Sequence, residues 1–207
     1  MEQSPNGQII QGKALVAFTD GACEPNPGHG AAAYILRDSA GGQLEARGFY
    51  LGDNTTNNVA EFEGVARAAE AAARHHATRL TIYSDSRMIV MQLQGRWRVK
   101  AEHLQDYYGR ALDALGKLPR WSISWIPREQ NYQADTVAGC AVRFRRDVDY
   151  GGREILQPAS AQRGPTQPFR HARGSVYPTE CFRTTTTRDT YREAIRTKQL
   201  KARNVQR

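Results

Sequence analysis

The sequence predicts an α/β domain built on a mixed β-sheet, followed by a basic extension. Three strand-like runs come before the first helical run, and helical and strand-like runs alternate after it. A strand reached through a helix pairs in parallel with an earlier strand, whereas strands joined by short turns pair antiparallel. Both kinds of connection occur here, so we expect one sheet of mixed direction.

The first 51 residues predict a leader and a three-stranded antiparallel meander. Residues 1–13 are polar and rich in Gly, Pro and Gln, which indicates a flexible leader. Strands are expected over residues 14–19, 31–37 and 44–51, separated by the Pro/Gly loop CEPNPGHG and the hairpin signal DSAGGQ. The first strand ends on Asp20, where we expect the chain to break into a turn.

A long helix is expected after DNTTNN, which supplies several possible N-caps. The following run, VAEFEGVARAAEAAARHH, is rich in Ala and Glu and contains no Pro. Apolar residues recur at helical spacing and predict one buried stripe, made of Val59, Phe62, Val65, Ala66 and Ala69. Glu61 lies beside this stripe, so its side chain is expected to point at the sheet.

The remaining pattern alternates strands and helices. A strand over 80–84 runs into Asp85, and a helix follows at once over 86–93. An amphipathic helix is expected over 102–118, then a strand over 121–126. The last element is a helix over residues 132–142, which carries Asp135 near its start.

Four carboxylates are therefore expected at one edge of the sheet. Asp20 and Asp85 end two strands that parallel pairing places side by side, while Glu61 and Asp135 enter from helices. Such converging charges repel strongly unless cations neutralise them. Oxygen ligands without His or Cys favour Mg²⁺ or Mn²⁺, and a pair of such ions suits in-line displacement at phosphorus.

Four spaced motifs in this element order, TDGAC-x-x-NPG, TTNN-x-x-AE, SDS and PREQN-x-x-AD, resemble the type 1 ribonuclease H family across residues 14–142. The resemblance implies a ribonuclease-H-like fold, a five-stranded sheet in the order 3-2-1-4-5 flanked by helices. It also implies hydrolysis of the RNA strand of RNA–DNA hybrids, with two Mg²⁺ ions (or Mn²⁺) and with 5′-phosphate and 3′-hydroxyl products. The implied metal-binding and catalytic carboxylates are Asp20, Glu61, Asp85 and Asp135.

The same motifs imply residues that contact the hybrid. Recognition of the ribose 2′-hydroxyl needs hydrogen-bonding groups facing the minor groove. The matching positions are Gly21, Ala22, Cys23, Asn26, Asn57, Asn58, Ser86 and Arg87. Two structural alternatives remain open: Asn26 is equally expected as a turn residue, and Asn57 or Asn58 as a helix cap.

Arg128 departs from the pattern of many family members, which place His in this loop. A bacterial and archaeal subgroup has Arg there instead. Arginine cannot act as a general base near neutral pH, so phosphate contact is its expected role, with any part in catalysis left open. Arg87 similarly replaces a common Gln. The segment GRWRVK offers only a weak version of the family's basic protrusion, and Trp97 within it is equally expected in the core.

The positive charge lies almost wholly in the C-terminal part of the chain. Residues 143–207 carry 15 Lys and Arg against 6 Asp and Glu, whereas residues 1–142 carry 14 against 15. Residues 143–207 are expected to be largely irregular, with a possible short helix over 190–203. This tail is expected to bind nucleic-acid phosphates, to dock a protein partner, or to remain a solubilising extension.

A second function class remains possible: a non-catalytic ribonuclease-H-like module that binds nucleic acid or assists assembly in a larger nucleoprotein. A DEDD-type exonuclease is less consistent, because Asp20 is followed by Gly21-Ala22 rather than by a D-x-E pair. No run approaches the roughly 20 apolar residues of a membrane span. Three cysteines without CxxC spacing favour reduced thiols, so we expect a cytoplasmic protein. We also expect the domain to be monomeric.

Overall fold

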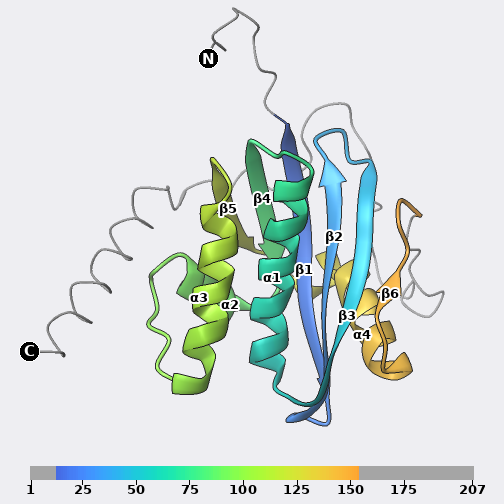
Figure 1. Cartoon of the computed structure of the whole chain (residues 1–207), viewed down its shortest axis with the longest axis vertical. Coiled ribbons are helices and arrows are strands. Elements are labelled where there is room, and N and C mark those ends of the chain that lie inside the picture. The colour runs from blue at the N-terminus through green and yellow to red at the C-terminus, as the bar shows by residue number, and fades with distance from the viewer. Residues whose placement is uncertain (1–12, 154–207) are drawn as a thin grey trace, which may run out of the picture.

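A mixed sheet of six strands, in the order β5-β4-β1-β2-β3-β6, organises the computed structural model, which describes residues 13–153 (Figure 1). Helices cover both faces: α1 packs on one face, and α4 lies on the other. The elements are β1 (Ala14–Glu24), β2 (Gly28–Asp38), β3 (Gln43–Thr55), α1 (Asn57–Arg74), β4 (Arg79–Ser84), α2 (Arg87–Leu93), α3 (Glu102–Gly116), β5 (Trp121–Trp125), a 3₁₀ turn (Arg128–Gln130), α4 (Tyr132–Phe144) and β6 (Val148–Asp149).

The predicted strand order 3-2-1-4-5 is confirmed for the first five strands. β1, β2 and β3 form an antiparallel meander, and β4 and β5 join it in parallel. The predicted count of five strands is wrong because β6 adds a sixth strand beside β3. β6 contains only two residues in an Arg-rich segment, so it leaves no periodic signal in the sequence.

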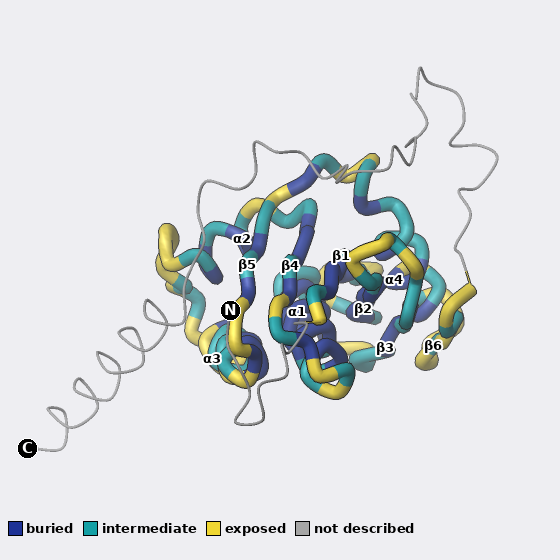
Figure 2. Tube along the Cα trace, turned by 90° about the horizontal axis from the view of Figure 1, so that it is seen from above, coloured by how far each residue is buried: buried dark blue, intermediate teal, exposed yellow. Residues whose placement is uncertain are grey.

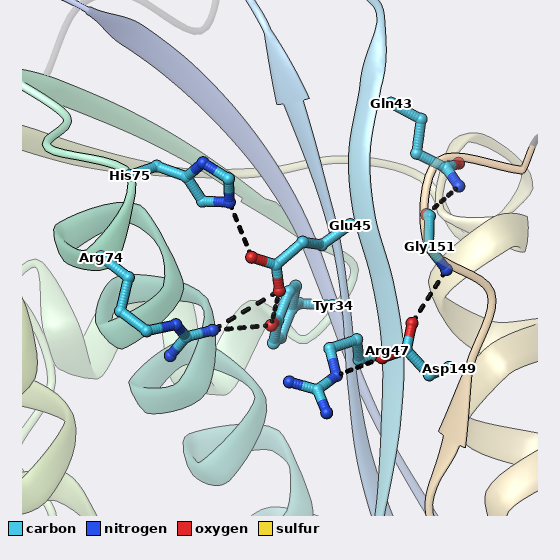
Figure 3. Close-up of polar contacts among 8 residues, drawn as sticks. All are labelled: Tyr34, Gln43, Glu45, Arg47, Arg74, His75, Asp149 and Gly151. Carbon is cyan, nitrogen blue, oxygen red and sulfur yellow. Dashed lines mark hydrogen bonds and ion pairs between the residues drawn. The ribbon is translucent and has the colours of Figure 1, made fainter.

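Side chains as well as backbone bonds fasten β6 to the sheet (Figure 3). The Arg47 guanidinium lies 3.0 Å from the Asp149 carboxylate, and the Gln43 amide donates to the carbonyls of Gly151, at 3.0 Å, and of Arg153. Ordered structure therefore continues past Val142, where the sequence predicted the folded domain to end. The rest of the expected tail, with its helix at 190–203, and the leader up to residue 12 lie outside the described residues.

The strands of the meander are longer than their sequence signals. β1 continues through Gly21 to Glu24, and Asp20 pairs with Ala33. The expected break after Asp20 is therefore wrong, since the turn occupies only residues 25–27. Backbone pairing with β2 outweighs the local turn preference of an Asp-Gly pair. Asp20 consequently lies within a hydrogen-bonded strand and not at a loop.

The main core lies between the sheet and helices α1 and α3. The predicted stripe of α1 is buried in full, and Figure 2 shows dark blue residues where α1 faces the sheet. Leu104, Ala111 and Leu115 bury the inner face of α3 against the same core. A smaller apolar cluster, which includes Val137 and Ala138, lies under α4 on the other face.

Three further findings bear on the sequence predictions: the exposure of Trp97, the state of two cysteines and the character of the helices. Trp97 is 46% exposed, so its placement in the core is wrong. Within residues 13–153, Cys23 and Cys140 are free thiols. No helix of this part of the chain is long and apolar enough to cross a membrane.

Candidate active site

Asp20 and Asp85 come from adjacent parallel strands. The register of β1 and β4 pairs Thr19 with Ser84, the residues immediately before the two aspartates. Strand pairing alone therefore brings the two carboxylates to the same level of the sheet. Asp20 is 5% exposed and Asp85 is half-buried.

Glu61 reaches Asp20 because α1 crosses β1 at very short range. A Cβ built on Gly21 would lie 2.4 Å from the Glu61 backbone nitrogen, closer than any real contact. A Cβ on Gly64 would likewise lie 3.0 Å from the Asp20 carbonyl oxygen. The helix is fixed at its start by Thr56, whose side chain accepts a hydrogen bond from the Val59 amide. Thr56, rather than Asn57 or Asn58, is thus the N-cap.

Burial and mutual repulsion disfavour ionisation of the two inner carboxylates. Burial, followed by the charges of Asp85 and Asp135, raises the pKa of Asp20 from 3.8 to about 8. Burial, followed by the charges of Asp20 and Asp85, raises the pKa of Glu61 well above its usual range. The Glu61 Oε2 atom is buried and has no hydrogen-bond partner among the described residues. Additional positive charge would stabilise the ionised forms of these groups.

Asp135, in the first turn of α4, forms an ion pair with Arg128, whose charge also affects the pKa values of Asp20 and Glu61. The Arg128 Nη2 atom lies 2.6 Å from Asp135 Oδ1, and this ion pair is the main cause of the raised pKa of Arg128. The Arg128 charge also opposes the upward pKa shifts of Asp20 and Glu61. Arg128 itself is 74% exposed, so it can turn toward solvent or toward a ligand.

Asn131 and Trp125 contact Asp85, and the sequence did not single out either residue. The Asn131 amide nitrogen donates to Asp85 Oδ1 at 2.6 Å, and the Trp125 indole donates to the Asp85 backbone carbonyl at 3.0 Å. Asn131 belongs to the PREQN-x-x-AD motif, of which only Arg128 and Asp135 are expected in the site. The available signal was an amide just before a helix that carries one of the four candidate carboxylates.

The expected substrate residues Cys23 and Asn26 fold the turn between β1 and β2 against the start of α1. The Cys23 thiol lies 3.0 Å from the Thr55 carbonyl oxygen, to which it donates. Asn26 Oδ1 accepts a hydrogen bond from the Asn57 amide at 3.2 Å. The turn interpretation of Asn26 is therefore confirmed, and its side chain nitrogen makes no hydrogen bond within residues 13–153.

The other expected substrate residues surround the carboxylates at different depths. Gly21 is buried against the backbone of α1. Ala22 and Asn58 are half-buried. Ser86 begins α2 without a side-chain cap bond, and Arg87 is exposed beside it. Ser86 and Arg87 thus follow Asp85 directly in the chain, and Asn57 and Asn58 begin the helix that carries Glu61.

The donor set fits a divalent cation of the Mg²⁺ class. It consists of carboxylate oxygens, which are the ligands that Mg²⁺ prefers. Glu61 Oε2 has no hydrogen-bond partner among the described residues, and the pKa of Asp20 is raised, so a bound cation would stabilise both carboxylates. As the side chains lie within residues 13–153, however, no three His, Cys, Asp or Glu side chains are arranged so that they could hold a metal ion together. One oxygen of Asp85 accepts a hydrogen bond from Asn131, and one oxygen of Asp135 accepts a hydrogen bond from Arg128.

Comparison with known proteins gives consistent similarities over the same residues. The profile of the Reverse transcriptase-like family matches residues 18–141. Ribonuclease HI of Halobacterium salinarum is 33% identical over 135 residues, which cover 65% of this chain and 67% of that protein. The bifunctional protein Rv2228c of Mycobacterium tuberculosis is 30% identical over 128 residues, but these span only 35% of its length and 62% of this chain.

Solved structures share the fold. The crystal structure of RNase H1 from Halobacterium salinarum superposes with a TM-score of 0.61 at 33% identity, covering 63% of this chain and 98% of that one. LC11-RNase H1, solved in complex with an RNA/DNA hybrid, superposes with a TM-score of 0.60 at 29% identity, covering 63% and 98%. The residues matched by the family profile, 18–141, include all four carboxylates.

Proposed function

Because this chain belongs to the type 1 ribonuclease H family, we propose that it is an endoribonuclease that hydrolyses the RNA strand of RNA–DNA hybrids. The observation that carries the proposal is the cluster of Asp20, Glu61, Asp85 and Asp135, delivered by β1, α1, the end of β4 and α4. A cluster that burial and repulsion destabilise in its ionised form is suited to binding cations that stabilise it.

The four carboxylates would hold two Mg²⁺ ions, with Mn²⁺ as an alternative. When bound, the ions would supply positive charge that activates the attacking water and stabilises the charge that develops on the leaving 3′-oxygen. The products would then carry 5′-phosphate and 3′-hydroxyl ends. Asp20 would be one of the residues that hold these ions, because the charges of both Asp85 and Asp135 act on its carboxylate.

Arg128 would contact phosphate and would not move protons. Its pKa is raised further by Asp135, so it stays protonated throughout the working pH range. Its 74% exposure allows the guanidinium to leave Asp135 and bind a phosphate of the incoming strand. Arg87, which is exposed and lies two residues after Asp85 in the chain, would add a second cationic contact.

Recognition of ribose would rest on the turn between β1 and β2 and on the start of α1. The side-chain nitrogens of Asn26, Asn57 and Asn58 are hydrogen-bond donors near the cluster, and Cys23 holds this turn in place. The 2′-hydroxyl distinguishes RNA from DNA, so these groups would select the strand to be cut. Ser86 and the backbone of Ala22 would complete the contacts close to the carboxylates.

A cleavage assay on labelled substrates tests this proposal. The full chain is incubated with an RNA–DNA hybrid, single-stranded RNA or double-stranded RNA, with Mg²⁺, Mn²⁺ or a chelator. We expect cleavage of the hybrid alone, loss of cleavage with the chelator, and loss of at least about 10²-fold in Asp85→Asn. Hybrid binding without any cleavage would contradict the proposal and support the non-catalytic module instead.

A further inference from the structure

Asn131 is hydrogen-bonded to two of the four residues that supply the carboxylates and to the residue immediately before a third. Its side-chain Nδ2 donates to the Thr19 carbonyl at 2.9 Å, one residue before Asp20, and to Asp85 Oδ1 at 2.6 Å. Its backbone carbonyl accepts from the Asp135 amide at 3.1 Å. One residue therefore connects β1, the end of β4 and the start of α4 at the level of the cluster.

The ordinary role of Asn at this position does not account for these contacts. Asn131 precedes α4, where an Asn side chain usually accepts a hydrogen bond from an amide of the first helical turn. Here the side chain makes no such bond. Asn131 is 1% exposed, and its Oδ1 atom has no partner among the described residues. The amide thus leaves its acceptor unsatisfied while both contacts of its nitrogen are directed to the sheet.

The chemistry of an amide suits a cluster of acids. A neutral donor can fix the rotation of a carboxylate without adding a charge that would compete with a cation. The hydrogen bond engages only Oδ1 of Asp85, and Oδ2 accepts no hydrogen bond within residues 13–153. Groups that orient a metal-binding side chain in this way typically affect metal affinity or activity by about 10- to 100-fold.

We propose that Asn131 is a positioning residue, whose amide holds the Asp85 carboxylate beside Thr19 of β1 in the orientation that binds a divalent cation. This inference rests on the proposed function, because it takes the carboxylates as cation ligands. It concerns binding of the cation before any substrate is present. Asn131 acts through Asp85 and does not itself touch the substrate.

Calorimetric titration of the full chain with Mg²⁺ alone tests the inference. We expect Asn131→Ala to bind Mg²⁺ about tenfold more weakly than the unmodified protein. In hybrid cleavage, kcat should fall while KM for the hybrid stays within about twofold, because Asn131 orients a ligand and does not bind the strand. Gln130→Ala is the matched control, since it removes a carboxamide one residue away whose side chain makes no hydrogen bond in the described structure. Unchanged Mg²⁺ affinity in a folded Asn131→Ala protein would overturn the inference.

A double-mutant cycle tests whether the effect passes through Asp85. In an Asp85→Asn background, Asn131→Ala should change the remaining Mg²⁺ affinity by less than about twofold, because the carboxylate to be oriented is already absent. An equal tenfold loss in both backgrounds would show that Asn131 acts generally on the fold, and would overturn the inference.

A measurement on the unmodified protein covers the case in which Asn131→Ala does not fold. The side-chain NH₂ signals of Asn131 in an NMR spectrum should shift when Mg²⁺ saturates the site. Static Asn131 signals, observed while the backbone signals of Asp20 and Glu61 shift, would overturn the inference. The calorimetric and NMR measurements need no hydrolysis. A chain that binds Mg²⁺ through Asn131 and Asp85 but cleaves no hybrid would therefore contradict the proposed function alone.

Discussion

The guanidinium of Arg128 lies 2.6 Å from the carboxylate of Asp135, so one proposed metal ligand is already paired with a cation of the chain itself. The two residues are seven apart, on the loop before α4 and in its first turn. Arg128 therefore competes with a divalent cation for Asp135, and the same guanidinium is the group proposed to bind the phosphate of the hybrid.

Arg128→Ala should strengthen Mg²⁺ binding while it weakens binding of the hybrid. The ion pair is largely exposed, and such pairs contribute about 0.2–1 kcal/mol, which corresponds to an increase in Mg²⁺ affinity of up to about fivefold. KM for the hybrid should rise because a phosphate contact is lost. Calorimetry and cleavage kinetics measure the two effects, and Arg128→Lys, which keeps the charge, should show less of both. Weaker Mg²⁺ binding in Arg128→Ala would contradict the competition.

The metal-free protein should lose stability as the pH rises from about 4 to about 8. The folded-state pKa of Asp20 is about 8, against 3.8 for an unperturbed aspartate, so the folded state binds a proton that the unfolded state has already released. Stability is then complete below the lower value and falls by up to about 1.4 kcal/mol for each pH unit between them.

Asp20→Asn should remove this part of the pH dependence. Denaturant unfolding in a chelator at pH 5 and at pH 8 measures it, and the variant should be the more stable protein at pH 8 although it is inactive. Saturating Mg²⁺ should restore stability to the unmodified protein at pH 8, by about 2.7 kcal/mol at a hundred times Kd. Parallel stability curves for the two proteins would contradict the raised pKa.

Gly21→Ala should destabilise the protein by about 3 kcal/mol and reduce cleavage. The new Cβ would lie 2.4 Å from the Glu61 nitrogen and 2.6 Å from the Ala60 carbonyl carbon, so α1 would have to move away from β1. The matched control is Gly139→Ala on the exposed side of α4, where a Cβ meets nothing within 4 Å. That change should leave cleavage intact and stabilise α4 by about 0.5–1 kcal/mol. Thermal unfolding compares the two variants, and similar effects would refute the close-approach argument.

Truncation after Arg153 should flatten the salt dependence of hybrid binding without loss of fold. The removed residues, 154–207, carry 11 Lys and Arg against 4 Asp and Glu, so their removal takes away charge that can release counterions from nucleic acid. Binding measured across a salt series gives the slope, and an unchanged slope would exclude these residues from hybrid binding.

Truncation after Val142 should behave differently. It removes β6, the Asp149 partner of Arg47 and the Gly151 carbonyl bound by Gln43, and leaves the edge of β3 unpaired. We therefore expect a lower melting temperature for this variant than for truncation after Arg153. Equal melting temperatures would show that β6 contributes nothing measurable to stability.

The sequence predicted the order of the first five strands, through its family resemblance, and it singled out the four candidate carboxylates. Helical and strand periodicity identify α1, β4 and α4, and the rules of strand connection then bring Asp20 and Asp85 to neighbouring positions. Local sequence signals are enough to place these carboxylates, because each one lies in or directly after a helix or strand that the surrounding residues predict. The boundaries of β1 were predicted less well, since pairing with β2 extends the strand through a local Asp-Gly signal.

Only the tertiary structure decided which groups surround those carboxylates. Asn131 bonds to Thr19 across 112 positions of sequence, and Gln43 bonds to Gly151 across 108. Neither side chain has a periodic or motif signal that specifies a partner so far away. Close approach of Gly21 to α1 and the repulsion that raises the pKa of Asp20 likewise depend on packed distances, which the chain fixes only when its elements come together.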